Sequence, residues 1–105
     1  FTELTNPPDD KRLFICRETA EWFRDKKVKC VGFGDGVSIE NNYEDVCAFH
    51  DILMEKDIVF LEVLKNLDQL SSRVFFMSYS PLPIKGLDSC PVRAYAIEGL
   101  KEFSE

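Results

Sequence analysis

The sequence predicts an α/β domain that consists of a mixed sheet with flanking helices. Two segments with helical periodicity alternate with short apolar segments, which Gly, Pro and Asp separate. This alternation is typical of strands connected by helices. The chain has 105 residues, and its 45% hydrophobic content with 9 Phe can form one core. We therefore expect residues 1–105 to form a single domain.

The first helix is expected over residues 17–27, after a loop at residues 6–12 that contains Pro-Pro and Asp-Asp. Trp22 and Phe23 supply its apolar stripe, and large aromatic residues dominate the cores of small domains. Both rings are therefore expected in the core. The basic residues that end this segment complement the negative end of the helix dipole.

Five short apolar segments are expected to form strands. Glycine ends the first strand, and a Gly-Asp-Gly turn separates it from the second. The NLDQL segment between the third and fourth strands is expected to form a turn or a single helical turn. The expected strands cover residues 29–34, 37–41, 58–64, 73–84 and 92–100.

The second helix, expected over residues 44–56, carries the chain's only histidine. One face of this helix contains, at positions i, i+3, i+4 and i+7, Val46, Phe49, His50 and Leu53. A histidine on an apolar face is most often a core residue whose ring nitrogens are hydrogen-bonded. Neutral imidazole is also the commonest protein ligand of zinc and similar metals, so both interpretations of His50 stay open.

Glu62 places a carboxylate within the apolar strand expected over residues 58–64. Because both faces of this strand are otherwise apolar, we expect it to be covered on two sides. An ionised carboxylate buried there without a partner would cost several kcal/mol. Glu62 is therefore paired with a Lys or Arg, bound to a metal, or placed on an edge strand.

His50 and Glu62 can approach a common centre if the chain reverses at Asp57. The helix descends roughly 9 Å from His50 to Lys56, and five strand residues return about 17 Å. Two long side chains can close the remaining offset of roughly 8 Å. One histidine and one glutamate still make an incomplete site, because catalytic zinc usually has three protein ligands.

Charge and cysteine content narrow the possible partners and compartments. The net charge of −6 argues against non-specific binding to nucleic acid or to an anionic membrane surface. No apolar run is long enough to span a bilayer. The spacing of the four cysteines fits neither a zinc knuckle nor a redox pair, so we expect reduced, buried thiols in a cytoplasmic protein. The four are Cys16, Cys30, Cys47 and Cys90.

Two long segments resemble the C-terminal half of the cyclase family of metal-dependent hydrolases, which includes bacterial kynurenine formamidase (arylformamidase) and isatin hydrolase. Residues 49–70, FHDILMEKDIVFLEVLKNLDQL, contain the family's histidine, the strand with a glutamate and the N-L-D-x-L run. Residues 81–97, PLPIKGLDSCPVRAYAI, are similar to its PL-x-I-x-G-x-D-G-x-PVRA pattern. Residues 18–41 are similar to the segment that precedes these two.

The resemblance implies a cyclase-like (swivelling β/β/α) fold, of which this chain would be the C-terminal segment. It also implies that His50 and Glu62 are ligands of a divalent metal centre, zinc or manganese. The family's H-x-G-T-H-x-D-x-P motif is missing, and the chain opens at Phe1 without methionine. We therefore expect an N-terminal half or a partner chain to supply the other ligands and the acid/base histidine. No catalytic residue is assigned within this chain.

The activity implied is the hydrolysis of a small amide, such as N-formylkynurenine or a cyclic amide, by water that the metal activates. The chain alone would be inactive, and a homo-oligomer is expected. Two alternatives stay open: a non-catalytic module that dimerises through the surface of the missing half, and an unrelated acidic binding protein. Asp88 and Arg93 are expected to hold a loop and a strand in register. The VGFGD segment leaves open whether Asp35 takes the family's acidic position.

Overall fold

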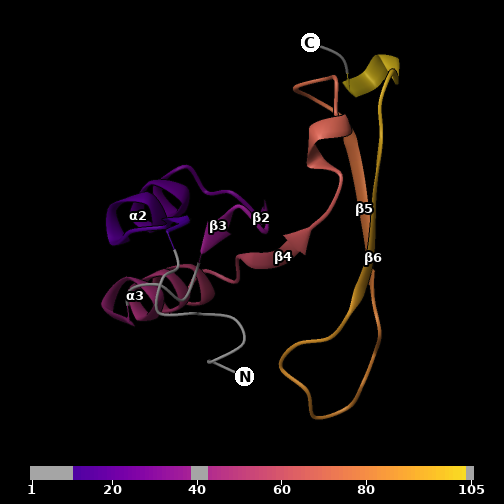
Figure 1. Cartoon of the computed structure of the whole chain (residues 1–105). Helices are drawn as coiled ribbons and strands as arrows, with labels where there is room; N and C mark the ends of the chain where they lie inside the picture. Colours follow the sequence, from indigo (N-terminus) through magenta and orange to yellow (C-terminus); the bar gives the residue numbers. More distant parts are fainter. Residues whose placement is uncertain (1–10, 39–42, 104–105) are drawn as a thin grey trace. The chain divides into compact units, whose positions relative to one another are not determined.

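The computed structural model describes residues 11–38 and 43–103, and the chain divides into two compact units, Phe1–Lys65 and Asn66–Glu105 (Figure 1). Two helices and several short strands confirm the α/β class. The expected single mixed sheet is wrong for the described residues, because their strands form three separate two-stranded sheets. That both units belong to one domain stays a prediction.

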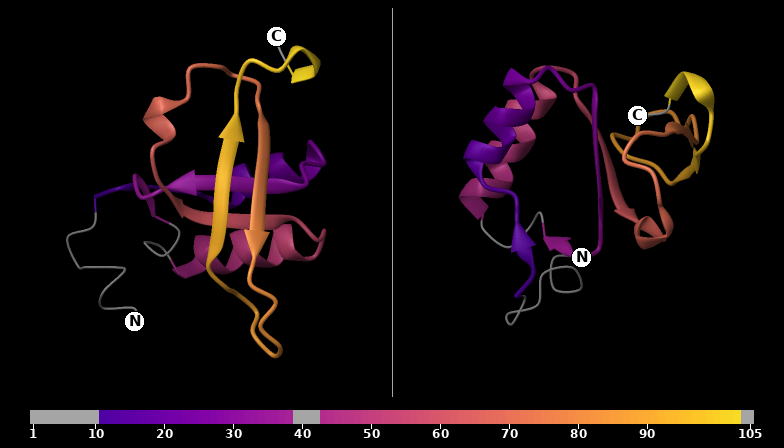
Figure 2. Two further views of the ribbon diagram at one scale, coloured as in Figure 1. Left: turned by 90° about the vertical axis from the view of Figure 1, so that its right-hand side faces the viewer. Right: turned by 90° about the horizontal axis from the view of Figure 1, so that it is seen from above.

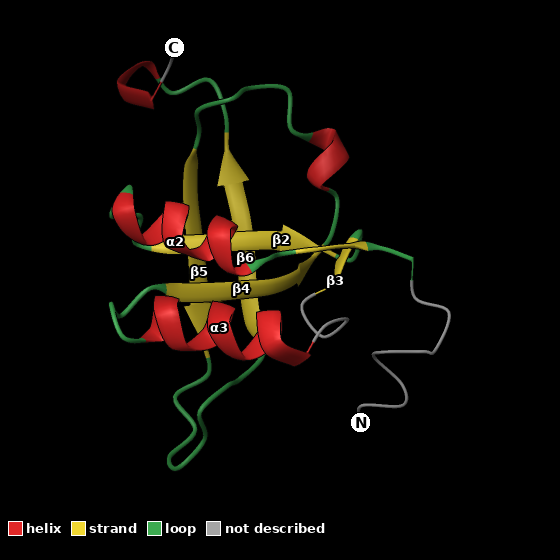
Figure 3. Ribbon diagram, turned by 90° about the vertical axis from the view of Figure 1, so that its left-hand side faces the viewer, coloured by secondary structure: helices red, strands yellow, loops and turns green. Residues whose placement is uncertain are grey.

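The first unit is a helix layer on a parallel strand pair. Its elements are β1 (Leu13–Phe14), α2 (Arg17–Asp25), β2 (Cys30–Gly34), β3 (Val37–Ser38), α3 (Tyr43–Met54) and β4 (Val59–Leu64). Strand β1 pairs with β3 and strand β2 with β4, both in parallel. Parallel neighbours need a crossover, and α3 lies in the connection between β2 and β4. Figure 3 shows α2 and α3 side by side over one face of the β2–β4 pair.

The core of the first unit lies between the two helices and the β2–β4 pair. Phe49 and Leu53 of α3 are 1% and 0% exposed, as the helical periodicity predicts. The Phe49 ring stacks on Phe60 of β4 at 4.8 Å between centroids and meets Phe33 of β2 edge-on at 6.1 Å. Removing each such side chain from water contributes about 1.5–3 kcal/mol. These rings fix α3 to the strands.

Helix α2 presents a different face to this core than its aromatic residues suggest. Ala20 is 0% exposed, and Phe23, one turn further, packs against the core cluster. Trp22 is 56% exposed, and the Lys26 ammonium lies 5.7 Å from its ring centroid. The expectation that Trp22 is a core residue is therefore wrong. Ala20 and Phe23 share a face at spacing i, i+3, and Trp22 falls outside it.

The two helices of the first unit end in the same way. Lys27 after α2 and Asp57 after α3 have left-handed backbone angles, with φ of 57° and 55°. The next residue then bonds back to the helix: Val28 N–H to the Phe23 carbonyl at 3.4 Å and Ile58 N–H to the Leu53 carbonyl at 3.1 Å. This pattern closes a helix end, normally with glycine at the left-handed position. It also confirms the expected chain reversal at Asp57.

Strand β4 contains a bulge that the sequence pattern does not predict. Gly32 pairs with Leu61 and Gly34 with Leu64, so that Glu62 and Val63 together oppose Phe33. Val63 has φ of 56°, which is rare for a β-branched residue. The bulge disturbs the two-residue alternation of the strand. In addition, Val59 and Val63 are 43% and 58% exposed, so the expected coverage of both faces is wrong.

The second unit is built on an antiparallel hairpin. Strands β5 (Phe76–Pro81) and β6 (Val92–Ile97) pair antiparallel, and two short helices lie near the same end of the pair (Figure 2). Helix η1 (Leu67–Gln69) precedes β5, and helix η2 (Lys101–Phe103) follows β6. Helix η1 confirms the single turn expected at NLDQL. No described side chain of this unit is buried. A two-stranded hairpin is marginally stable alone, so this unit depends on contacts beyond its own strands.

The carboxylate of Glu98 joins the two ends of the second unit. Its Oε1 accepts hydrogen bonds from the backbone N–H groups of Ser71 and Ser72 at 2.8 and 2.6 Å. The Ser71 hydroxyl donates to the same carboxylate. The N–H of Ser72, followed by the groups of Ser71, lowers the pKa of Glu98 below its ordinary value of 4.5.

All four cysteines lie in the described residues, are half-buried and form no disulfide there. The expected full burial of these thiols is therefore wrong. Within residues 11–38 and 43–103, no helix is long and apolar enough to cross a membrane.

We predict that Leu53→Ala lowers the free energy of unfolding by about 2–5 kcal/mol, because it leaves a cavity beneath α3. Met54→Ala, at the adjacent residue that is 58% exposed, is the matched control and should cost clearly less. Urea unfolding followed by circular dichroism measures both. Equal losses for the two variants would contradict the packing described for α3.

We predict that the Glu98 carboxyl titrates below pH 4.5, and that the amide protons of Ser71 and Ser72 shift with the same midpoint. Because the folded-state pKa is lowered, this contact stabilises the fold above the unfolded-state pKa and is lost as pH falls through the folded-state value. Carboxyl-carbon and amide NMR titrations measure these midpoints. A Glu98 midpoint at or above 4.5, or amides that do not follow it, would show that the contact is absent.

Candidate functional site

His50 lies on α3 where the helix meets strand β4. Its ring is half-buried and contacts Phe49 and Phe60 edge-on, at centroid distances of 5.6 and 5.4 Å. The position follows from the sequence, because His50 adjoins the deeply buried Phe49 on the apolar face of the helix. Both aromatic contacts restrict the orientation of the imidazole.

The hydrogen bond of His50 determines which ring nitrogen is available. Nδ1 lies 2.7 Å from the carbonyl oxygen of Val46, one turn earlier in α3. A carbonyl oxygen only accepts hydrogen bonds, so Nδ1 must carry a proton and donate. In the neutral ring, Nε2 then holds the free lone pair. Metal-binding histidines generally have this arrangement, with the other ring nitrogen bonded to a carbonyl or carboxylate.

Nε2 of His50 is also accessible. Within the described residues it makes no hydrogen bond, and no buried side-chain nitrogen or oxygen there is without a partner. Nε2 is therefore not fully enclosed by the described residues. The half-buried ring, its two aromatic contacts and the Nδ1 bond support the interpretation of His50 as a core residue, and its role as a metal ligand stays a prediction.

Glu62 lies in the bulge of β4 and is exposed. The expected burial of this carboxylate is therefore wrong. Strand β4 pairs only with β2 among the described strands, which makes it an edge strand, and no hydrogen bond or ion pair to Glu62 occurs in the same residues. Of the three interpretations, the ion pair with Lys or Arg is wrong, the edge strand is observed, and the metal stays a prediction.

The structure places His50 and Glu62 on adjoining elements. The imidazole contacts Phe60, and Glu62 follows Phe60 by two residues, a rise of about 7 Å along the strand. Within residues 11–38 and 43–103, no hydrogen bond joins the two side chains, and the His50 ring bonds to Val46.

Asp35 and Lys65 form an ion pair at the carboxyl ends of β2 and β4. Each directly follows its strand, and the Lys65 ammonium forms an ion pair with the Asp35 carboxylate. This hydrogen bond and the charge of Lys65 lower the pKa of Asp35. Arg12 donates to the Asp35 backbone carbonyl at 3.1 Å. The Asp35 carboxylate is thus already occupied by a cation.

The donor atoms present fit part of a metal centre. An accessible imidazole nitrogen with a fixed tautomer and an exposed carboxylate are both suitable ligands for zinc or manganese. The described residues contain no group of three or more His, Cys, Asp or Glu side chains that could hold a metal ion. His50 and Glu62 could therefore contribute two ligands to a centre that needs others.

Sequence patterns misassigned one polar pair and missed another. Asp88 and Arg93, expected to hold a loop and strand in register, are exposed and form no hydrogen bond or ion pair with described residues. The loop turns instead at Gly86, whose φ of 85° a side chain rarely adopts. The Asp35–Lys65 pair was missed, although opposite charges directly after two parallel strands are a usable signal.

No protein-family model, curated protein or solved structure matches this chain.

Proposed function

We propose that this chain contributes His50 and Glu62 as two ligands of the zinc or manganese centre of an amide hydrolase of the cyclase family. The observation that carries the proposal is the hydrogen bond from Nδ1 of His50 to the Val46 carbonyl at 2.7 Å, which leaves Nε2 accessible as a donor atom. The order of matching residues from Glu18 to Ile97 supports the family assignment.

Each of the two side chains has a distinct role in this proposal. His50 supplies a neutral donor whose orientation Val46 and Phe60 restrict. Glu62 supplies a negative charge, which offsets part of the charge of the cation. When bound, the metal would supply the Lewis acidity that activates water toward an amide carbonyl. The substrate would be a small N-acyl or cyclic amide, such as N-formylkynurenine.

The remaining parts of the centre lie outside this chain in the proposal. An N-terminal half or a partner chain would provide the other ligands and the acid/base group, and the functional protein would be a homo-oligomer. This chain alone would bind a metal weakly and would not catalyse. Four cysteines without a disulfide among the described residues favour a reducing compartment, for which we propose the cytoplasm.

We predict that Zn²⁺ added to the chain shifts the Nε2 resonance of His50 and leaves Nδ1 protonated. His50→Ala should abolish this binding, and Glu62→Gln should weaken it by about tenfold or more, because it removes a ligand charge. Side-chain ¹⁵N NMR measures the shift, and calorimetry measures the affinity.

The matched control is Glu55→Gln, which removes an equal charge from an exposed residue after α3. It should change the affinity less than twofold, roughly the effect of a distant exposed charge. Equal weakening by Glu55→Gln and Glu62→Gln, or no response of His50 Nε2 to Zn²⁺, would refute the proposed metal ligands.

The second unit favours an alternative function, a non-catalytic module that dimerises. None of its described side chains is buried, and Leu82, Leu87 and Tyr95 are 54%, 58% and 50% exposed. Exposed apolar residues in such density mark interaction surfaces. In this alternative, the hairpin surface would bind a second copy of the chain.

We predict for this alternative that the chain sediments as a dimer at micromolar concentration, and that Leu82→Ser with Leu87→Ser makes it monomeric. Leu13→Ser, at a residue of the first unit that is 80% exposed, should leave the dimer intact. Analytical ultracentrifugation distinguishes the outcomes. A monomeric parent chain, or a dimer that both variants disrupt equally, would exclude the hairpin surface.

A further inference from the structure

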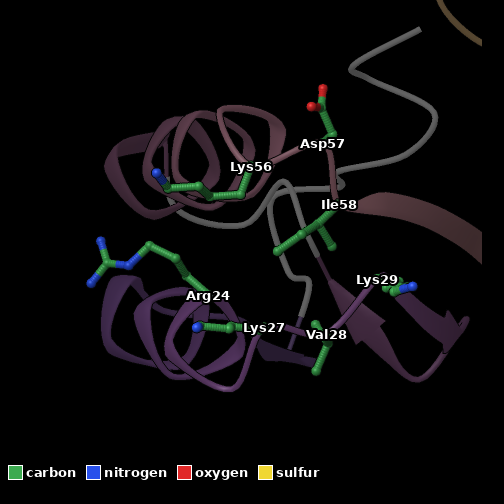
Figure 4. A pocket seen from close by; sticks show the side chains of 7 residues that line it. All are labelled: Arg24, Lys27, Val28, Lys29, Lys56, Asp57 and Ile58. Atoms are coloured by element: carbon green, nitrogen blue, oxygen red, sulfur yellow. The ribbon is translucent and has the colours of Figure 1, made fainter.

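A basic hollow of about 520 Å³ lies in the first unit, where both helices end and strands β2 and β4 begin (Figure 4). It is formed by two equivalent connections, α2 to β2 and α3 to β4. Its position is the amino end of the parallel pair, whereas Glu62, Asp35 and Lys65 are at or near the carboxyl end. The lining residues are Arg24, Lys27, Val28, Lys29, Lys56, Asp57 and Ile58.

The charges around this hollow do not cancel. Four of its lining residues are cations, in a chain whose net charge is −6. Asp57 lines it too, and Asp25 binds the Nε of Arg24 at 3.0 Å. The ends of two helices add about one negative charge together. Positive charge remains after all of these, because the three lysines form no ion pair within the described residues.

Lysines near helix ends often only satisfy the last carbonyls and the dipole. Here backbone N–H groups already donate hydrogen bonds to carbonyls near the helix ends. Val28 N–H donates to the Phe23 carbonyl, and Ile58 N–H donates to the Leu53 carbonyl. Lys27 occupies a left-handed position, with φ of 57°, where glycine is normally favoured. Helix capping therefore does not account for the cluster.

The arrangement of the side chains fits an anion. In Figure 4, the nitrogen ends of Arg24, Lys27 and Lys56 point to the same side. Lys29 and the Asp57 carboxylate point away from them. Arg24 is partly engaged by Asp25, so the lysines would carry most of the recognition. An ammonium acts as a compact point charge and binds phosphate oxygens well without the planar geometry that a carboxylate–arginine pair requires. The volume suits a small molecule.

We infer that this hollow binds the phosphate group of a small soluble molecule, chiefly through Lys27 and Lys56. The site is independent of the proposed metal centre and uses none of its residues. The net charge of −6 argues against nucleic acid as the source of the phosphate, because a polyanion would be repelled outside this hollow.

The test is a titration of the full chain with inorganic pyrophosphate, in a buffer without phosphate or divalent metal. Backbone amide resonances of Val28 and Ile58 should shift in a saturable manner. The double variant Lys27→Gln with Lys56→Gln should bind about tenfold more weakly or worse, since each lost charge contact weakens binding several-fold. Both lysines are exposed, so the variant should fold, which circular dichroism verifies.

The matched control is Lys11→Gln with Lys85→Gln, which removes the same charge at exposed residues outside the hollow. It should change the affinity less than about twofold, as expected for distant, screened charges. Equal weakening by both double variants, or shifts that do not include Val28 and Ile58, would overturn the site. Binding to phosphatidic acid vesicles without binding of pyrophosphate would overturn the assignment to a soluble ligand.

Discussion

The contact between Phe49 and Phe60 is the interaction on which the first unit depends. Strands β2 and β4 run parallel, so the chain must return over their face between them, and α3 lies in that return. The two stacked rings, whose centroids are 4.8 Å apart, hold the helix against the strand. His50 follows Phe49 and therefore meets the edge of the same Phe60 ring. The contact that stabilises the core thus also positions the one imidazole of the chain.

The two ends of the parallel pair have different chemistry. At the amino end, two helix termini and their lysines leave an excess of positive charge around a hollow. Toward the carboxyl end, Asp35 and Lys65 neutralise each other, and Glu62 remains exposed without a partner among the described residues. The proposed metal ligand Glu62 and the proposed anion site therefore lie toward opposite ends of the parallel pair.

Local periodicity predicted the two helices, strands β2 and β4, the start of β3 and the neighbourhood of His50, because burial follows a regular repeat there. Strand β1 was not expected, and residues 39–41 of the expected second strand lie outside the described residues. Periodicity failed for Glu62, since a bulge is a property of the pairing between two strands and not of either strand alone. It also failed for Trp22, because the small Ala20 and not the largest ring sets the face of α2 that contacts α3. The basic hollow combines lysines from two segments about thirty residues apart, which only the tertiary structure brings together.

The extra residue in β4 sets the register of the strand's last positions against β2. With even pairing, Gly34 would stand opposite Val63, and every later residue would be displaced by one place along β2. Lys65 would then stand one residue beyond Asp35 instead of opposite it. The number of residues in β4 after Leu61 thus determines which residue stands opposite Asp35. Deleting the extra residue of the bulge would leave the rings of Phe49 and Phe60 in place and move Lys65 along β2.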